Sequence, residues 1–430
     1  FQAEDGIRDV ERSRGLGDVY KRQDEEDLES PNVPHTHSHA LSAHSEMPSV
    51  DRSPVFYFLV ATLTVAAAAT LLGLLALWPN EERSEEIQKN ADEIALTSEL
   101  LRATVDEVTE ANCGYSFSSE VELCRNVTVI VQEGPETGSL VALPEVNTSF
   151  DPTFPKLSVG DDVILGFDSV TNSYYFQDRD RLSSLWWLIL LFAVTVICLA
   201  RVRGVLALFA MGGTVFVLVK FVAPSVLDGN DPVLVCVVAA AVIAFFSLYF
   251  THGFNLMTTV ALAGTLIALA LTLGISWVFF ELAQFSGFSS EEAFILPFVA
   301  EGLDVRGLLL GGTIIAALGA LDDVTVTQAA TVLELNVRNS ELSTRQLTMS
   351  GLRIGREHIA STVNTLLLAY AGSSIPLLLL FAVSDQSLAD VANSELIAIE
   401  IVRTLCGSIG LVAALPLTTY LAALLIGSDK

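Results

Sequence analysis

Two adjacent carboxylates interrupt an apolar stretch of the sequence at Asp322 and Asp323. Thr325 and Gln328 follow within the next two turns of a helix. If the preceding apolar helix continues through these positions, one carboxylate could bind a cation or carry a proton, with Thr325 and Gln328 as oxygen ligands. The alternative is a helix N-cap at the membrane surface, which would open a separate amphipathic helix over Val324–Leu335.

Two further polar groups each start near a histidine and run into an apolar block. Their members are Glu357, His358, Asn364 and Thr365 in one group, and His252, Thr258 and Thr259 in the other. The sixth and seventh positions after each histidine hold a polar pair, which predicts a faint parallel repeat. Transporters build sites at such repeat interfaces. Chance similarity within Leu/Ala/Thr-rich sequence is the alternative.

Motifs for soluble catalysis are missing from the sequence: it has no nucleophile elbow, P-loop, zinc motif or dinucleotide fingerprint. We therefore expect no enzyme activity, cofactor or metal centre. The formal net charge of -27 argues against nucleic acid as a partner, because that needs a basic face. Alternating histidines near the N-terminus could bind a transition metal, with a solvated tail as the alternative; they are His35, His37, His39 and His44.

The elements that must position these residues are apolar blocks. The chain is 51% hydrophobic and only 17% charged, and its mean hydropathy is +0.53. The blocks are Val55–Trp78, Leu185–Ala200, Val205–Val222, Pro232–Phe250, Thr258–Phe280, Gly307–Leu321, Ile359–Val383 and Ile401–Ile426. Most are long enough to cross a hydrocarbon core of about 30 Å. We expect a polytopic α-helical membrane protein of about eight transmembrane helices, seven of them in a membrane domain over 185–427. The Pro297-containing run Phe294–Ala300 is too short to span.

Between the first two blocks lies an acidic segment, 79–184, with 21 acidic and 7 basic residues. Five short runs within it alternate apolar and polar residues, which predicts a small β-rich domain, either an OB-like barrel or a generic sandwich. Cys113 and Cys124 are its only cysteines. They could form a disulfide if the domain faces an oxidising compartment.

The distribution of Lys and Arg predicts which side each loop occupies. With the N-terminus inside, the cytoplasmic side receives Arg52, Arg201, Arg203, Arg338, Arg345, Arg353, Arg356 and Lys430. The short outer loops keep Lys220 and Arg306, with Arg403 near an outer helix end. We therefore expect both termini in the cytoplasm and the β-rich domain outside.

The N-terminal residues differ in character from the rest. Residues 1–23 resemble a translated sequencing-adaptor read-through, and we exclude them from functional reasoning. Residues 24–54 are acidic and poor in large apolar side chains, which predicts a disordered cytoplasmic tail.

Three stretches together resemble the YibE/F family of bacterial multipass membrane proteins. They are GALDDVTVTQAATVLEL (Gly319–Leu335), GREHIASTVNTLLLAYAGSSIPLLLLF (Gly355–Phe381) and HGFNLMTTVALAGT (His252–Thr265). The resemblance covers roughly residues 100 to 427. It implies a permease-like protein in a bacterial cytoplasmic membrane and carries over no catalytic residues.

These observations predict a permease for a small solute or ion, coupled to H⁺ or Na⁺. Asp322 and Asp323 would carry the coupling ion, and Glu357 and His358 would form a cytoplasmic gate or proton relay. Thr259, Asn364 and Thr365 would line the path. The alternative is an envelope assembly or accessory protein whose β-rich domain binds a partner. Besides lipid and a small solute or monovalent cation, the expected partners are a second copy or an envelope protein.

Overall fold

The computed structural model describes residues 54–80, 87, 89, 99–113, 123–134, 136–147, 154–168, 173–383 and 386–427. The adaptor-like start and the acidic, histidine-bearing tail predicted from the sequence lie outside these residues. Within them, six helices are long and apolar enough to cross a membrane, or up to seven if a bent pair counts as one span. The six are Pro54–Ala76 (α1), Leu182–Leu227, Pro232–His252 (α5), Leu256–Leu282 (α6), Val305–Arg338 (α8) and Glu395–Ile426 (α12).

The second of these helices joins two of the expected apolar blocks. It comprises α3 (Leu182–Val217), a π-helical turn η1 (Leu218–Val222) and α4 (Ala223–Leu227). Within α3 the backbone breaks at Arg201, where φ is 53° and ψ is -128°. Its 46 residues would measure about 69 Å if straight, more than twice a hydrocarbon core of about 30 Å.

The bent pair lies where the sequence predicts a single span. α9 (Thr344–Ser373) and α10 (Ile375–Val383) meet at 60°. Pro376 lies at this bend, and its ring nitrogen cannot donate to the hydrogen-bond ladder of the preceding turn. Two short helices complete the described part, α7 (Glu291–Val299) and α11 (Leu388–Asn393). The predicted apolar run Phe294–Ala300 thus belongs mostly to α7.

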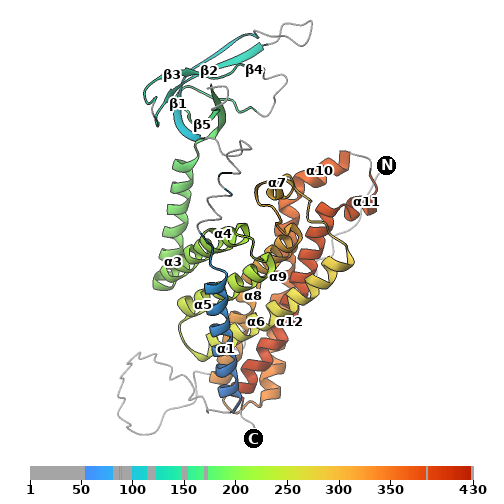
Figure 1. Ribbon diagram of the computed structural model, residues 1–430. Coiled ribbons are helices and arrows are strands. Elements are labelled where there is room, and N and C mark those ends of the chain that lie inside the picture. The colour runs from blue at the N-terminus through green and yellow to red at the C-terminus, as the bar shows by residue number, and fades with distance from the viewer. Residues whose placement is uncertain are drawn as a thin grey trace, which may run out of the picture. The chain divides into compact units, whose positions relative to one another are not determined.

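Helices α6, α8 and α12 pack against one another at the centre of the bundle, with α5 and α9 against their outer faces (Figure 1). Two reciprocal contacts join α6 and α12. The Thr418 side chain lies over Gly264, and the Thr272 side chain lies over Gly410. Glycine permits this close approach because a side chain there would overlap the threonine hydroxyl. The central core is therefore dense, with its threonines turned inward.

The polar segment contains one antiparallel sheet in the order β3-β2-β1-β5-β6, with β4 paired to β2. Its strands are β1 (Glu99–Asn112), β2 (Leu123–Val131), β3 (Leu140–Ala142), β4 (Val146–Asn147), β5 (Asp162–Asp168) and β6 (Ser173–Arg179). One face buries alternate residues such as Val105, Val129 and Val163. Cys113 and Cys124 form a disulfide beside the end of the β1–β2 pairing. The period-two pattern therefore corresponds to strands that bury one face.

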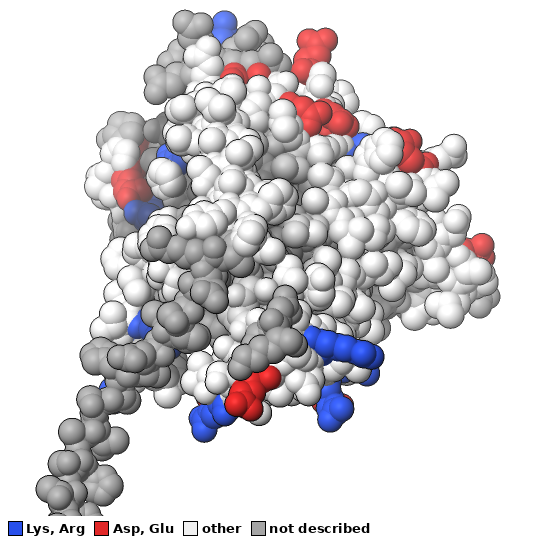
Figure 2. Space-filling model, turned by 90° about the horizontal axis from the view of Figure 1, so that it is seen from below, with Lys and Arg blue, Asp and Glu red and all other residues white. Residues whose placement is uncertain are grey.

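Figure 2 views the molecule from one end. Most of this surface is uncharged, and the Lys, Arg, Asp and Glu side chains that appear are sparse and lie mainly around its margin. White marks every described residue other than these four types; the large hydrophobic side chains that are exposed along α1 and α3 are what helices surrounded by lipid present.

Candidate functional site

Helix α8 runs without a break through Asp322 and Asp323. The two carboxylates therefore lie in the middle of a long helix, and neither caps a new one at Val324. Asp322 is 17 residues beyond Val305, which places it about 26 Å along the helix axis. If α8 enters the bilayer near Val305, Asp322 lies within the last turn of a hydrocarbon core about 30 Å thick.

Asp322 is turned toward α6 inside the bundle. Its Oδ1 atom is buried and accepts no hydrogen bond from the part of the chain that the structure describes. Thr265 of α6 lies close enough to act on this carboxylate. The Thr265 hydroxyl is already bonded to the Thr325 hydroxyl, with 2.7 Å between the oxygens. A buried carboxylate oxygen without a donor is costly, so a proton or a cation at this position would be stabilising.

Asp323 faces the other way and meets α9. Its carboxylate is 67% exposed, and its Oδ2 lies 3.7 Å from His358 Nε2. The contact becomes an ion pair only when His358 is protonated. Glu357, the neighbour of His358, is exposed. The structure thus brings the Asp322–Asp323 pair and His358 together, whereas Glu357 points outward from the same helix.

Gln328 occupies a niche between three helices. Its Nε2 donates to the Gly351 carbonyl oxygen of α9 at 2.9 Å and to the Thr419 hydroxyl of α12 at 2.7 Å. Gly351 and Gly355 leave the room that this amide needs, since a Cβ at Gly355 would lie 2.6 Å from Gln328 Oε1. The side chain therefore ties α8 to α9 and α12, which is a packing role; the ion-ligand role expected from its spacing stays a prediction.

The two polar pairs of the predicted repeat differ in their surroundings. Thr258 is buried at the start of α6, where its hydroxyl donates to the Asn255 side chain at 3.2 Å. Thr259 is half-buried, and its hydroxyl lies 3.3 Å from the Tyr249 hydroxyl.

The corresponding pair on α9, Asn364 and Thr365, is exposed, as is His252 at the end of α5. None of the contacts described here links these residues to Asp322, so the structure does not gather the predicted repeat into one site.

A second charged pair, which the sequence interpretation did not single out, lies within α12. Arg403 donates to Glu400 at 2.7 Å, and its Nε lies 3.5 Å from the Thr313 hydroxyl of α8. Thr313 is nine residues before Asp322, so the Glu400–Arg403 pair meets α8 roughly 14 Å from Asp322 along the helix axis. The available signal was a Glu and an Arg one turn apart where the apolar block Ile401–Ile426 begins, and charged residues within membrane helices are costly and often functional.

Three cavities lie near these helices without including Asp322 or His358 among their lining residues. One of about 710 Å³ lies between α1 and α5. Another, of about 520 Å³, has Asp231, Glu281, Asp304 and Arg306 at the N-terminal end of α8 and reaches Leu310. A third, of about 210 Å³, lies between α9 and α12 and includes Glu400. Among the described residues, no group of three or more His, Cys, Asp or Glu side chains is placed to hold a metal ion.

Comparison with known families decides the affiliation. The model of the family described as "YibE/F-like protein" matches residues 188–428, more than half of the 430-residue chain. The chain belongs to the YibE/F-like family. Searches of curated proteins and of solved structures gave no match.

The family match covers the helices from within α3 to α12, begins after the sheet and leaves out α1. Asp322, Asp323 and His358 lie inside the matched region, as does the pair formed by Glu400 and Arg403. The expected resemblance began near residue 100, whereas the match begins at Leu188, so the disulfide-bonded sheet lies outside it. The candidate site is therefore part of the region by which this YibE/F-like protein is recognised.

Proposed function

We propose that this YibE/F-like protein is a permease that moves a small solute or ion across a bacterial cytoplasmic membrane, coupled to H⁺ or Na⁺. The observation that carries the proposal is the buried Asp322 Oδ1 atom, which accepts no hydrogen bond among the described residues although Thr265 of α6 lies beside the same carboxylate. Carboxylates within membrane helices are expensive and mark ion or proton pathways. A purely structural carboxylate would be expected to accept hydrogen bonds.

Asp323 and His358 would exchange the coupling ion with the cytoplasm. Asp323 follows Asp322 on α8, and His358 lies on the neighbouring helix α9. Both side chains are at least partly exposed. A proton leaving Asp322 has an acceptor nearby in the His358 imidazole, which lies 3.7 Å from the neighbouring Asp323 carboxylate. On the other side, about 18 Å of α8 separates Asp322 from Leu310, the innermost α8 residue of the 520 Å³ cavity. This arrangement suits a conformation closed toward that cavity, as alternating access requires.

The topology in this proposal has eight spans with both termini in the cytoplasm. The break at Arg201 would divide Leu182–Leu227 into two spans, and the bent pair α9–α10 would form one more. Arg201 would then lie at the cytoplasmic surface, in agreement with the distribution of Lys and Arg. Labelling a Ser139→Cys variant with a membrane-impermeant maleimide in intact cells tests this topology. Residue 139 would lie on the outer side of the membrane, so the reagent should label it.

The test of ion coupling uses solid-supported-membrane electrophysiology on proteoliposomes. A jump in Na⁺ concentration and, separately, a jump in pH should each be applied without solute. We expect one of them to displace charge in the native protein and Asp322→Asn to abolish that transient. Glu334→Gln is the matched control and should retain it, because Glu334 is an exposed carboxylate near the C-terminal end of the same helix, where it pairs with Arg338. An unchanged transient in Asp322→Asn would refute the assignment.

A second function is favoured by the sheet. Within the described residues, β3 and β6 each pair with one neighbour and so present edges that a partner strand can extend. An envelope assembly factor would use such an edge, on either an OB-like barrel or an open sandwich, and its helices would act as an anchor. This reading predicts no charge displacement in either jump for the native protein.

A further inference from the structure

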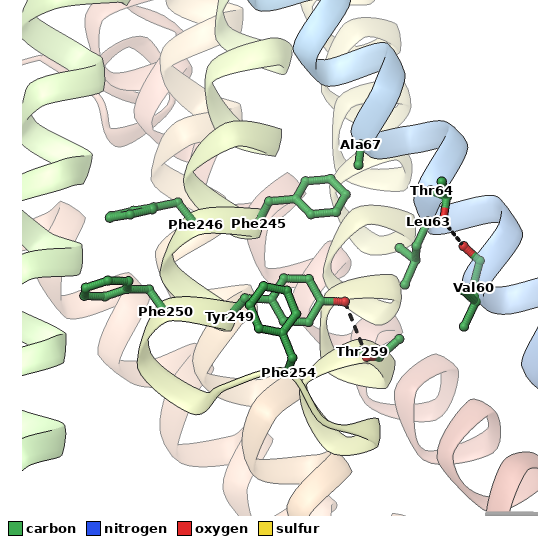
Figure 3. A pocket seen from close by; sticks show the side chains of 10 residues that line it. All are labelled: Val60, Leu63, Thr64, Ala67, Phe245, Phe246, Tyr249, Phe250, Phe254 and Thr259. Carbon is green, nitrogen blue, oxygen red and sulfur yellow. Dashed lines mark hydrogen bonds between the residues drawn. The ribbon is translucent and has the colours of Figure 1, made fainter.

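The cavity between α1 and α5 has walls suited to an apolar ligand. Val60, Leu63 and Ala67 of α1 face Phe245 and Tyr249 of α5 across it (Figure 3). Its volume of about 710 Å³ lies within the range of about 300–1,000 Å³ that is usual for ligand sites. The described residues that line it include no Asp, Glu, Lys, Arg or His. A hydrophilic solute would gain little there, whereas a hydrocarbon chain would gain from every contact.

One end of the cavity is polar. The Tyr249 hydroxyl lies 3.3 Å from the Thr259 hydroxyl, and the Phe254 ring stacks on Tyr249 with 4.5 Å between the centroids (Figure 3). Phe254 is 87% exposed in the turn between α5 and α6. An exposed aromatic beside a hydrogen-bonding hydroxyl is typical of the interface between lipid tails and headgroups.

A cationic side chain, Arg203, lies near the same end. The second half of α3 packs antiparallel to α5, with Phe209 against Phe250 at 6.4 Å and Gly213 beside Phe246. Continuing this alignment by about a turn and a half brings Arg203 to the turn between α5 and α6, where it acts electrostatically on His252. Both side chains are exposed. A basic group at the polar end of an apolar groove matches the headgroup of an anionic lipid.

We propose that this groove binds one anionic phospholipid, with an acyl chain between α1 and α5 and its phosphate beside Arg203. The membrane itself supplies this occupant, because α1 and α5 are both long and apolar enough to span and the outward faces of α1 are largely exposed. The lipid would join α1, which precedes the family-matched region, to α5 and α6 at the groove that separates them.

Native mass spectrometry of the full chain tests the proposal. Delipidated protein should be offered phosphatidylglycerol and, separately, phosphatidylcholine. We expect one firmly held phosphatidylglycerol per chain. Ala67→Trp fills the groove and should weaken its retention about tenfold, a difference of about 1.4 kcal/mol. Ala68→Trp is the matched control on the exposed side of α1 and should retain the lipid.

Two more variants separate the parts of the site. Phe254→Ala removes an exposed side chain, so it should fold normally and still reduce retention. Arg203→Gln should reduce the preference for phosphatidylglycerol over phosphatidylcholine about fivefold, as expected for one cation near a headgroup. Equal retention in Ala67→Trp and Ala68→Trp, or a bound molecule other than a phospholipid, would overturn the proposal. Size-exclusion elution identifies any variant that has lost its fold.

Discussion

Substituting Gly264 by alanine should destabilise the bundle through one identifiable contact. A Cβ at Gly264 would lie 2.1 Å from Thr418 Oγ1 and 3.2 Å from Thr418 Cβ. Thr418 is fully buried and β-branched, so rotating its hydroxyl away would bring its methyl group toward the same space. Overpacking of this kind costs about 1–3 kcal/mol.

Gly274 of the same helix provides the matched control. It also becomes alanine, but a Cβ there has no neighbour within 4 Å. Both variants gain the same helix propensity, about 1 kcal/mol, which cancels when they are compared. The free energy of unfolding, measured by steric trapping in micelles, should therefore be about 1–3 kcal/mol lower for Gly264→Ala than for Gly274→Ala.

The cause can be tested by removing the threonine. Thr418 Oγ1 has no hydrogen-bond partner among the described residues, so Thr418→Ala should lose little polar interaction. In the double variant, which combines Gly264→Ala with Thr418→Ala, the two alanine Cβ atoms would lie 3.2 Å apart. A small shift of one helix relieves this contact. The loss of unfolding free energy caused by Gly264→Ala should then be smaller by about 1 kcal/mol or more. The same cost in both backgrounds, or equal stability of the two glycine variants, would refute the reasoning.

Two further predictions concern other parts of the chain. Gln328→Leu removes the donor shared by Gly351 and Thr419 and should lower the free energy of unfolding by about 1–3 kcal/mol, measured by the same steric trapping; an unchanged value would mean that the amide does not join the helices. Replacing both Cys113 and Cys124 by serine opens a disulfide with a sequence separation of 11 and should destabilise the sheet by about 3 kcal/mol, seen as faster proteolysis within 99–179 while the helices stay intact. Equal proteolysis rates with and without the bond would contradict it.

Much of the architecture follows from local pattern. Apolar blocks of spanning length predict helices because a backbone in lipid must satisfy its own hydrogen bonds. The period-two runs around Val105, Val129 and Val163 predict strands because alternate side chains share one face. The number of spans is harder to predict, because the basic residues at Arg201 and Arg203 interrupt hydropathy without ending the helix, and the backbone there breaks inside α3.

The order of residues alone shows that two carboxylates follow an apolar block and that a histidine precedes another. The folded structure adds that Asp322 turns toward Thr265 and that Asp323 meets His358. It also shows that Gln328 fills a glycine-lined niche. The physical reason is that these contacts join α6, α8 and α9, segments far apart in the chain, and their mutual rotation is set by close packing at small residues, which spacing along one helix does not encode.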